Sequence, residues 1–167
     1  MGSHAAPFTR NTKSSRFRAA AHGWPPPGLP RLPFWLPLGN TLVLGLSSAA
    51  LQTGYARLKG GREATWAIAA TFLLGLLFFG LQVELWVSVW RAGLLPSAGA
   101  YPSVFWGLTC FHALHVLVGL VALGVLGWRV GQGYYNPARH LPVRLWTMYW
   151  HFVGAVWLLI FASVFVF

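Results

Sequence analysis

Four long apolar runs constrain this chain more than any other feature. They cover residues 34–56, 64–90, 102–128 and 144–166. Each run is close to the roughly 20 residues that an α-helix needs to cross a hydrocarbon core of about 30 Å. Barrel strands would be about half as long and would alternate in polarity, whereas a helix satisfies its own backbone hydrogen bonds in lipid. The pattern therefore predicts an all-α, integral membrane bundle of four transmembrane helices.

Composition excludes an ordinary soluble protein. Charged residues make up 8% of the 167 residues, against about 25% in soluble domains, and hydrophobic residues reach 56%. The net charge of +10 does not indicate nucleic-acid binding, because the basic residues lie in the first 31 positions and in the breaks between apolar runs. The single cysteine, Cys110, excludes an intrachain disulfide and a cysteine-based metal site.

Residues 1–33 differ in character from the rest of the chain. They are basic, contain no acidic residue and end in a proline-rich stretch at positions 24–30. Such a segment cannot bury a core, so we expect a flexible tail ahead of a membrane domain that spans residues 34–167. The same composition is also typical of an organelle transit peptide, and that alternative stays open.

Lys and Arg near the ends of the runs predict the orientation. The breaks after the first and third runs hold six of them, and the break after the second holds Arg91 alone. The tail adds three within about 20 residues of the first run. Because Lys and Arg collect on the cytoplasmic side of a membrane, both termini are expected on the outer face.

Four titratable side chains lie inside the apolar runs, where a charge costs about 2.5–3.5 kcal/mol on insertion scales. They are Glu84, His112, His115 and His151. Counting 1.5 Å per residue from the run ends puts Glu84 and His112 at similar depth, and His115 and His151 together at a deeper level. We therefore expect the first two to pair across the bundle.

Haem ligation, proton transfer and hydrogen bonding between helices are each compatible with these side chains, whereas a di-iron centre is not. His112 or His115 together with His151 would suit the axial ligands of one b-type haem, and Glu84 with the histidines would suit a proton relay. A di-iron centre needs several carboxylates, and the chain has only two acidic residues. Hydrogen bonding between helices is the preferred interpretation on physical grounds alone.

Small residues recur at intervals of four in the first run. Gly45, Ala49 and Thr53 form a stripe that would let another helix approach closely. Internal packing is the preferred interpretation of this stripe, and an interface with a partner is the alternative.

Four motifs, three of which contain the titratable residues, resemble subunit III of the haem–copper oxidases. They are LQVELW at 81–86, YPSVFW at 101–106, TCFHALHVLVG at 109–119 and YWHFVGAVW at 149–157. The family reads LQxxEY, YGSxFF, TGFHGLHVxxG and YWHFVDxVW in the same order, with the acid of the first motif one position later than Glu84. The resemblance covers roughly residues 33–167.

This resemblance implies a non-catalytic subunit III of a proton-pumping cytochrome c oxidase in aerobic respiratory electron transport. Subunits I and II would be its partners, haem and copper would lie in those partners, and this chain would bind phospholipid. It implies the bacterial inner (plasma) membrane, with the mitochondrial inner membrane as the alternative. A subunit-III-like partner of a quinol oxidase or nitric oxide reductase is the nearest alternative function. A stand-alone b-type haem protein is the alternative of another class.

The resemblance also implies roles for particular residues. Glu84 and the three histidines would form the polar interior, with Trp150 and Trp157 as packing anchors. Two departures stand out. Residues 1–33 contain nothing like the family's earlier helix with a Ser-Glu pair, and Gly154 stands where the family's last helix usually carries Asp. We therefore expect His151 to bond to a neutral group or to a neighbour.

Overall fold

The structure, a computed structural model, describes residues 35–166, and all of its regular elements are helical. The predicted all-α bundle is confirmed, and the predicted tail at residues 1–33 lies outside the described residues. The α-helices are α2 (Trp35–Lys59), α3 (Thr65–Arg91), α4 (Ala100–Gly131) and α5 (Leu141–Phe161). A short 3-10 helix, η1 (Pro96–Ala98), precedes α4, and a π-helical turn, η2 (Ala162–Val166), follows α5.

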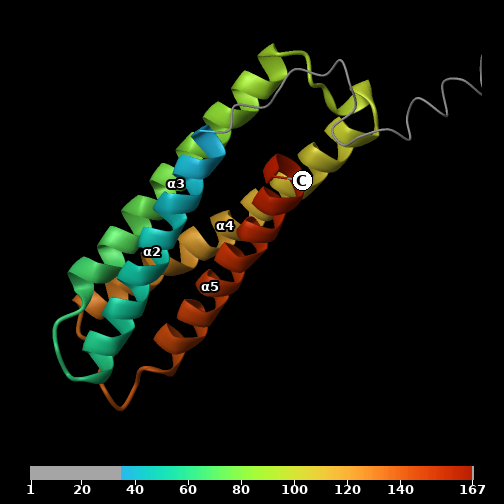
Figure 1. The fold of residues 1–167 in the computed structure, drawn as a ribbon. Helices are drawn as coiled ribbons and strands as arrows, with labels where there is room; N and C mark the ends of the chain where they lie inside the picture. The colour runs from blue at the N-terminus through green and yellow to red at the C-terminus, as the bar shows by residue number, and fades with distance from the viewer. Residues whose placement is uncertain (1–34, 167) are drawn as a thin grey trace, which may run out of the picture.

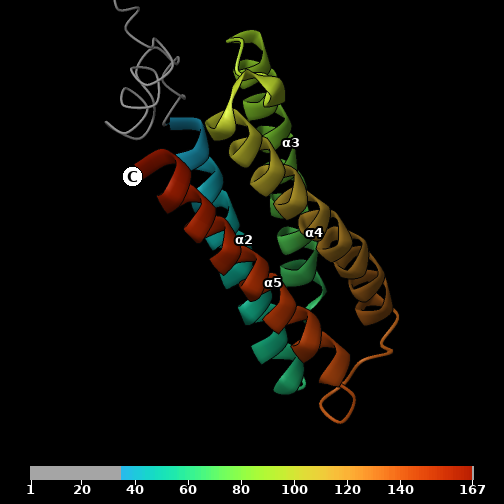
Figure 2. The same cartoon turned by 90° about the vertical axis from the view of Figure 1, so that its right-hand side faces the viewer.

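The four α-helices run alternately up and down the bundle. Each packs against two neighbours, so together they form a closed ring. α2 contacts α3 and α5, and α4 contacts α3 and α5. The α2–α3 and α4–α5 connections lie at the same end of the bundle (Figure 1). Seen from the side, α2 with α5 and α3 with α4 form two long pairs (Figure 2). This arrangement brings side chains from all four helices to one central axis.

The buried positions follow a seven-residue period. On α2 they alternate in steps of four and three from Asn40 to Leu58, and on α3 they do so from Thr71 to Val89. This period is the one that keeps a single seam facing the neighbouring helix in coiled coils and in most membrane bundles. The helices can therefore stay in contact over their full length.

α2, α3 and α4 end one to three residues beyond the predicted apolar runs because basic side chains belong to their last turns. Lys59 ends α2, and Arg129 lies in the last turn of α4, where a positive charge favours the helix dipole. At the start of α3 the Thr65 amide donates to the Glu63 carboxylate, at 2.7 Å. The hydrogen bonds from Thr65 hold the pKa of the exposed Glu63 below its usual value.

Three of the described helical segments are long and apolar enough to cross a membrane. They are Thr65–Arg91, Ala100–Gly131 and Leu141–Val164. α2 has 25 residues, about 37 Å of helix, but it is less apolar because polar residues such as Asn40 and Ser47 lie on its buried face. The predicted fourth span therefore stays a prediction for α2.

The outer surface of the bundle is apolar. Leu73, Val121 and Leu159 are 64%, 71% and 71% exposed, while Asn40 and Gln82 are fully buried. Large apolar side chains face outward on every α-helix, which is what lipid or a neighbouring subunit requires. Together with the three membrane-length helices, this surface marks an integral membrane bundle.

Basic residues gather at one end of the bundle. Both of the connections that the sequence predicted on the inner side lie at that end (Figure 1), and the Arg57 guanidinium lies over the Trp66 ring, 5.6 Å from its centroid. Among residues 35–166, Arg91 alone belongs to the opposite end. The six at the basic end are Arg57, Lys59, Arg62, Arg129, Arg139 and Arg144.

Candidate functional site

Trp150 of α5 forms the first of two indole layers in the bundle centre. It is fully buried, and its Nε1 donates a hydrogen bond to Ser47 Oγ of α2, at 3.0 Å. The ring lies on two glycines, because a Cβ added at Gly119 of α4 or at Gly75 of α3 would come within 2.7 Å or 3.0 Å of it. One side chain therefore touches the other three helices.

Trp157 forms the second indole layer, two helical turns further along α5. It is also fully buried, and its Nε1 donates to Thr41 Oγ1 of α2, at 3.0 Å. Phe78 of α3 meets this ring edge-on with centroids 5.1 Å apart, and His112 of α4 lies 5.3 Å away. In both layers, therefore, the indole N–H of a buried tryptophan on α5 donates to a hydroxyl group of α2, and the ring packs against α3 and α4.

A buried amide pair joins α2 to α3. Asn40 Nδ2 donates to Gln82 Oε1 at 3.3 Å, and both side chains are fully buried. Close by in sequence, Ser47 Oγ donates to the Thr71 carbonyl at 3.2 Å. Since buried polar groups are costly when unpaired, these bonds fix the register of α2 against α3.

We expect Gln82→Leu to destabilise the bundle by about 1–3 kcal/mol, because it leaves the Asn40 amide without its acceptor. Adding Asn40→Leu should restore much of the loss, since removing both partners can be nearly neutral. The midpoint of denaturant-induced helix loss in detergent measures both effects. A double variant as unstable as the sum of the two single variants would contradict the pairing.

The predicted contact between Glu84 and His112 is wrong. Glu84 lies on the exposed face of α3, whereas His112 is 1% exposed, and its Nε2 has no hydrogen-bond partner within the described part of the chain. The reason is the rotation of the helix between positions 82 and 84. Gln82, two residues before Glu84, faces the core, and two residues turn an α-helix by about 200°. Because the Gln82 amide faces the core, the Glu84 carboxylate faces the outer surface.

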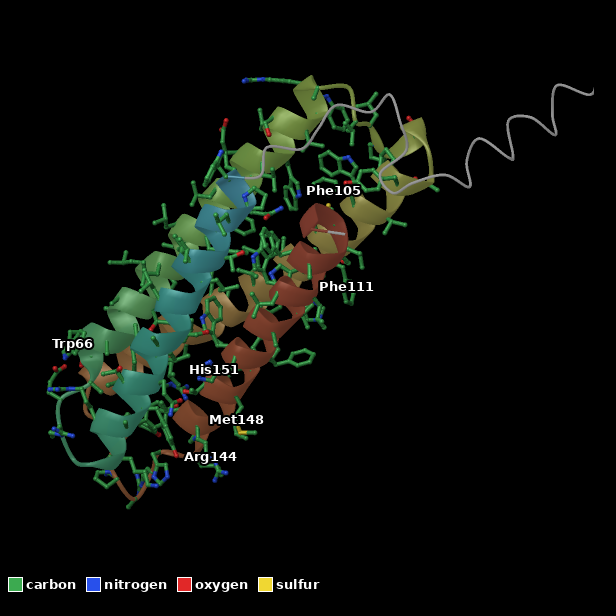
Figure 3. All side chains as sticks on the ribbon, in the orientation of Figure 1. Trp66, Phe105, Phe111, Arg144, Met148 and His151 are labelled. Atoms are coloured by element: carbon green, nitrogen blue, oxygen red, sulfur yellow. The ribbon has the colours of Figure 1, made fainter. Side chains whose placement is uncertain are left out.

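His115 and His151 do not bond to one another. The half-buried His115 donates from Nδ1 to the Phe111 carbonyl of its own helix, at 2.8 Å. His151 donates from Nε2 to Gln52 Oε1 of α2, at 3.2 Å, and Figure 3 shows it on α5 near α2. Its partner is a neutral amide, in agreement with the expectation drawn from Gly154.

The neighbours of His115 and His151 bear on the haem ligation that the sequence left open. Trp150 lies against Gly119, one turn beyond His115, and His151 already uses Nε2 in its bond to Gln52. Axial ligation of a haem through that nitrogen would therefore require breaking the bond to Gln52. Within residues 35–166, three or more His, Cys, Asp or Glu side chains nowhere gather as a metal-binding group.

The predicted internal packing of the Gly45–Ala49–Thr53 stripe is also wrong. All three residues are exposed, and a Cβ added at Gly45 would meet no atom within 4 Å. The buried face of α2 runs instead through Asn40, Leu44, Ser47, Leu51, Gly54 and Leu58. The glycines that allow close packing are Gly54, Gly75 and Gly119, each with other helices near its Cβ position.

Sequence reasoning missed Asn40, Ser47, Gln82 and the glycines under Trp150. The available signal was spacing, because the two buried polar residues of α2 lie seven positions apart, at 40 and 47. A seven-residue repeat of polar side chains within an apolar run marks an inward seam in a membrane helix.

A groove of about 630 Å³ follows α4 towards the basic end of the bundle. Leu117, Val121 and Val125 line it along α4, and Trp146 of α5 lines it from the side. Arg129 closes it at the basic end, where its guanidinium also lies over the Tyr134 ring, 5.7 Å from the centroid. The groove therefore combines an apolar length with one cation.

Comparison with known proteins agrees with the motifs. Residues 12–167 match the family model of cytochrome c oxidase subunit III. Proteins named cytochrome c oxidase subunit 3 from Marchantia polymorpha and Neurospora crassa are 36% and 41% identical over 85% of this chain. The corresponding protein of Triticum aestivum is 37% identical over the same share. The chain spans about half the length of these relatives, 53–54%. It belongs to the cytochrome c oxidase subunit III family.

Proposed function

We propose that this chain is the subunit III component of a cytochrome c oxidase complex in aerobic respiratory electron transport. The match to the family over residues 12–167 is the observation that carries the proposal. In this role the chain is non-catalytic and stabilises the catalytic subunit. Subunits I and II are its partners, and they hold the haem and copper that reduce oxygen and drive proton translocation.

The arrangement of the interior supports a scaffold rather than a redox role. The two indoles, the buried amide pair and His151 each form a hydrogen bond that joins one helix to another. Glu84 and His112 do not meet, so the first step of the proton relay considered from the sequence has no contact to pass through. Interhelical packing is the role we assign to His112, His115 and His151.

The groove along α4 supports phospholipid binding. From Leu117 to Arg129 it covers twelve residue steps, about 18 Å, which is slightly more than one leaflet of the hydrocarbon core. Its cationic end lies at the basic end of the bundle, which the charge rule assigns to the cytoplasmic side, where anionic lipids are enriched. We propose that an acyl chain lies along α4 with an anionic headgroup near Arg129.

The proposed location is an energy-transducing membrane, the bacterial plasma membrane first and the mitochondrial inner membrane as the alternative. Membrane-length helices and family membership support the membrane assignment. We assign α2 as the fourth span because it packs along α3 and carries exposed leucines such as Leu42 and Leu46. The start of α2 and the end of α5 then face the outer side.

Copurification tests the proposed function. A tagged chain extracted from native membranes in mild detergent should bring down a haem–copper catalytic subunit in a fixed ratio, measured by mass spectrometry and visible absorption. The purified complex should oxidise reduced cytochrome c with oxygen as acceptor. Oxidation of quinol only, or reduction of nitric oxide only, would favour the related partners instead. Recovery of the chain without any haem–copper subunit would contradict the proposal.

A further inference from the structure

Glu84 is an exposed carboxylate in the membrane-embedded part of α3. The helix has 27 residues, about 40 Å, so its ends extend beyond a hydrocarbon core of about 30 Å. Its middle residue is Phe78, and Glu84 lies six residues beyond it, about 9 Å from the midplane. The carboxylate therefore lies inside the hydrocarbon boundary on the outer face of the bundle.

The described part of the chain offers Glu84 no hydrogen bond and no ion pair. Arg91 is the basic residue of the same helix, and it lies seven residues further on, about 10 Å along the axis. Exposing an unpaired carboxylate to acyl chains is unfavourable, and ionisable residues in spans normally pair with another group. An ionised Glu84 carboxylate at this depth therefore needs a partner other than lipid.

Gly80 leaves the helix surface next to the Glu84 carboxylate without a side chain. Gly80 lies one turn before Glu84 on the same side of α3, it is exposed, and a Cβ added there would meet nothing within 4 Å. Missing side chains of this kind let two helix backbones approach closely in a membrane. We define the Glu84 face as the exposed residues Leu73, Leu76, Leu77, Gly80, Val83 and Glu84.

A second copy of this chain does not suit the Glu84 face. Two identical chains in one membrane are related by an axis along the membrane normal, so residues of equal depth meet across the interface. Glu84 would then face Glu84 in surroundings of low dielectric, where like charges repel strongly. A helix from a different chain avoids this repulsion and can bring a hydrogen-bond donor.

We propose that the Glu84 face of α3 is a docking surface for a transmembrane helix of another subunit. That helix packs over Gly80 and presents a cationic or hydrogen-bond-donating side chain to the Glu84 carboxylate. The identity of the complex rests on the proposed function, but the need for a partner follows from the exposed carboxylate itself.

Photo-crosslinking tests the docking surface in the native complex. With a benzophenone amino acid in place of Val83, irradiation of native membranes should join the chain to one transmembrane segment of a different subunit. Mass spectrometry of the adduct should identify that segment and find a donor side chain at the same depth. A crosslink to a second copy of the chain, or to lipid only, would overturn the proposal.

Matched glycine variants separate specific docking from general damage. Gly80→Leu fills the gap beside Glu84 and should lower the crosslink yield at least about tenfold, as should Glu84→Leu. Gly107→Leu is the control, because Gly107 of α4 is also exposed with nothing within 4 Å of an added Cβ. An unchanged yield in Gly80→Leu would overturn the proposal.

The same preparations distinguish this inference from the proposed function. If the unaltered chain brings down a haem–copper subunit but position 83 gives no protein crosslink, the docking surface is wrong and the function stands. If position 83 crosslinks to another membrane protein and no haem–copper subunit is present, the function is wrong and the docking surface stands.

Discussion

Trp150→Ala should destabilise the bundle by about 3–5 kcal/mol, the range for deleting a large aromatic side chain from a packed core. The indole contacts Gly75 and Gly119 and donates to Ser47, so its removal leaves a cavity bordered by three helices and a Ser47 hydroxyl that has lost its donor. Lipid cannot fill a cavity enclosed by protein, so the lost contacts are not replaced. Thermal or denaturant-induced loss of helix in detergent measures the change.

Trp128→Ala is the matched control for this variant. Trp128 is also a tryptophan, but it is 70% exposed near the end of α4. Its removal should change the unfolding midpoint little, because the side chain does not contribute to the core. If the two variants lowered stability equally, the indole layers would not be the centre of the fold.

Gly119→Ala should cost about 1–3 kcal/mol through overpacking. The new Cβ would come within 2.7 Å and 2.8 Å of two ring carbons of Trp150, which real Cβ atoms do not approach. Trp150 is fully buried and bonded to Ser47, so it cannot move aside freely. The unfolding midpoint in detergent again reports the loss.

Gly107→Ala on the same helix is the control for Gly119→Ala, since its added Cβ would meet nothing within 4 Å. It should be neutral or slightly stabilising, because alanine favours helix over glycine. A second check combines Gly119→Ala with Trp150→Phe, which gives the new methyl group room. The double variant should be less unstable than the sum of the single ones, and strict additivity would contradict the contact.

The fold was largely predictable because membrane helices can be located from the hydropathy and the length of each run along the sequence. Water is absent from the hydrocarbon core, so each apolar run must become a helix, and turn residues such as Gly60, Gly61 and Gly93 mark where the runs end. The α-helices accordingly start within three residues of the predicted runs, and α2, α3 and α4 also end within three residues of them. The fourth run ends at 166, where α5 has passed into the π-helical turn η2.

The site was less predictable because the missing information is rotation about each helix axis. In a soluble protein an apolar stripe shows which face is buried, but in lipid both faces are apolar. Depth counting placed Glu84 and His112 at similar levels, yet it could not show that Gln82 rather than Glu84 turns inward. The same ambiguity led to the choice of Gly45 over Gly54 as a packing position on α2.

Trp150 and Trp157 show what local sequence can and cannot indicate. Their motif predicted that they are packing anchors, and both side chains are fully buried in the structure. What they pack against comes from residues 31 to 116 positions away, including Gly119, Gly75, Ser47 and Thr41. Such long-range contacts depend on the arrangement of all four helices, which spacing along one helix does not contain.

We propose that this chain contributes packing to an oxidase complex and carries none of its redox centres. Separating the tagged chain from the purified native complex with a stronger detergent, and then measuring haem and copper in both fractions, tests that claim directly. We predict that all haem and copper remain with the other subunits, while the separated chain retains its helical circular dichroism. Haem or copper bound stoichiometrically to the separated, folded chain would contradict the claim.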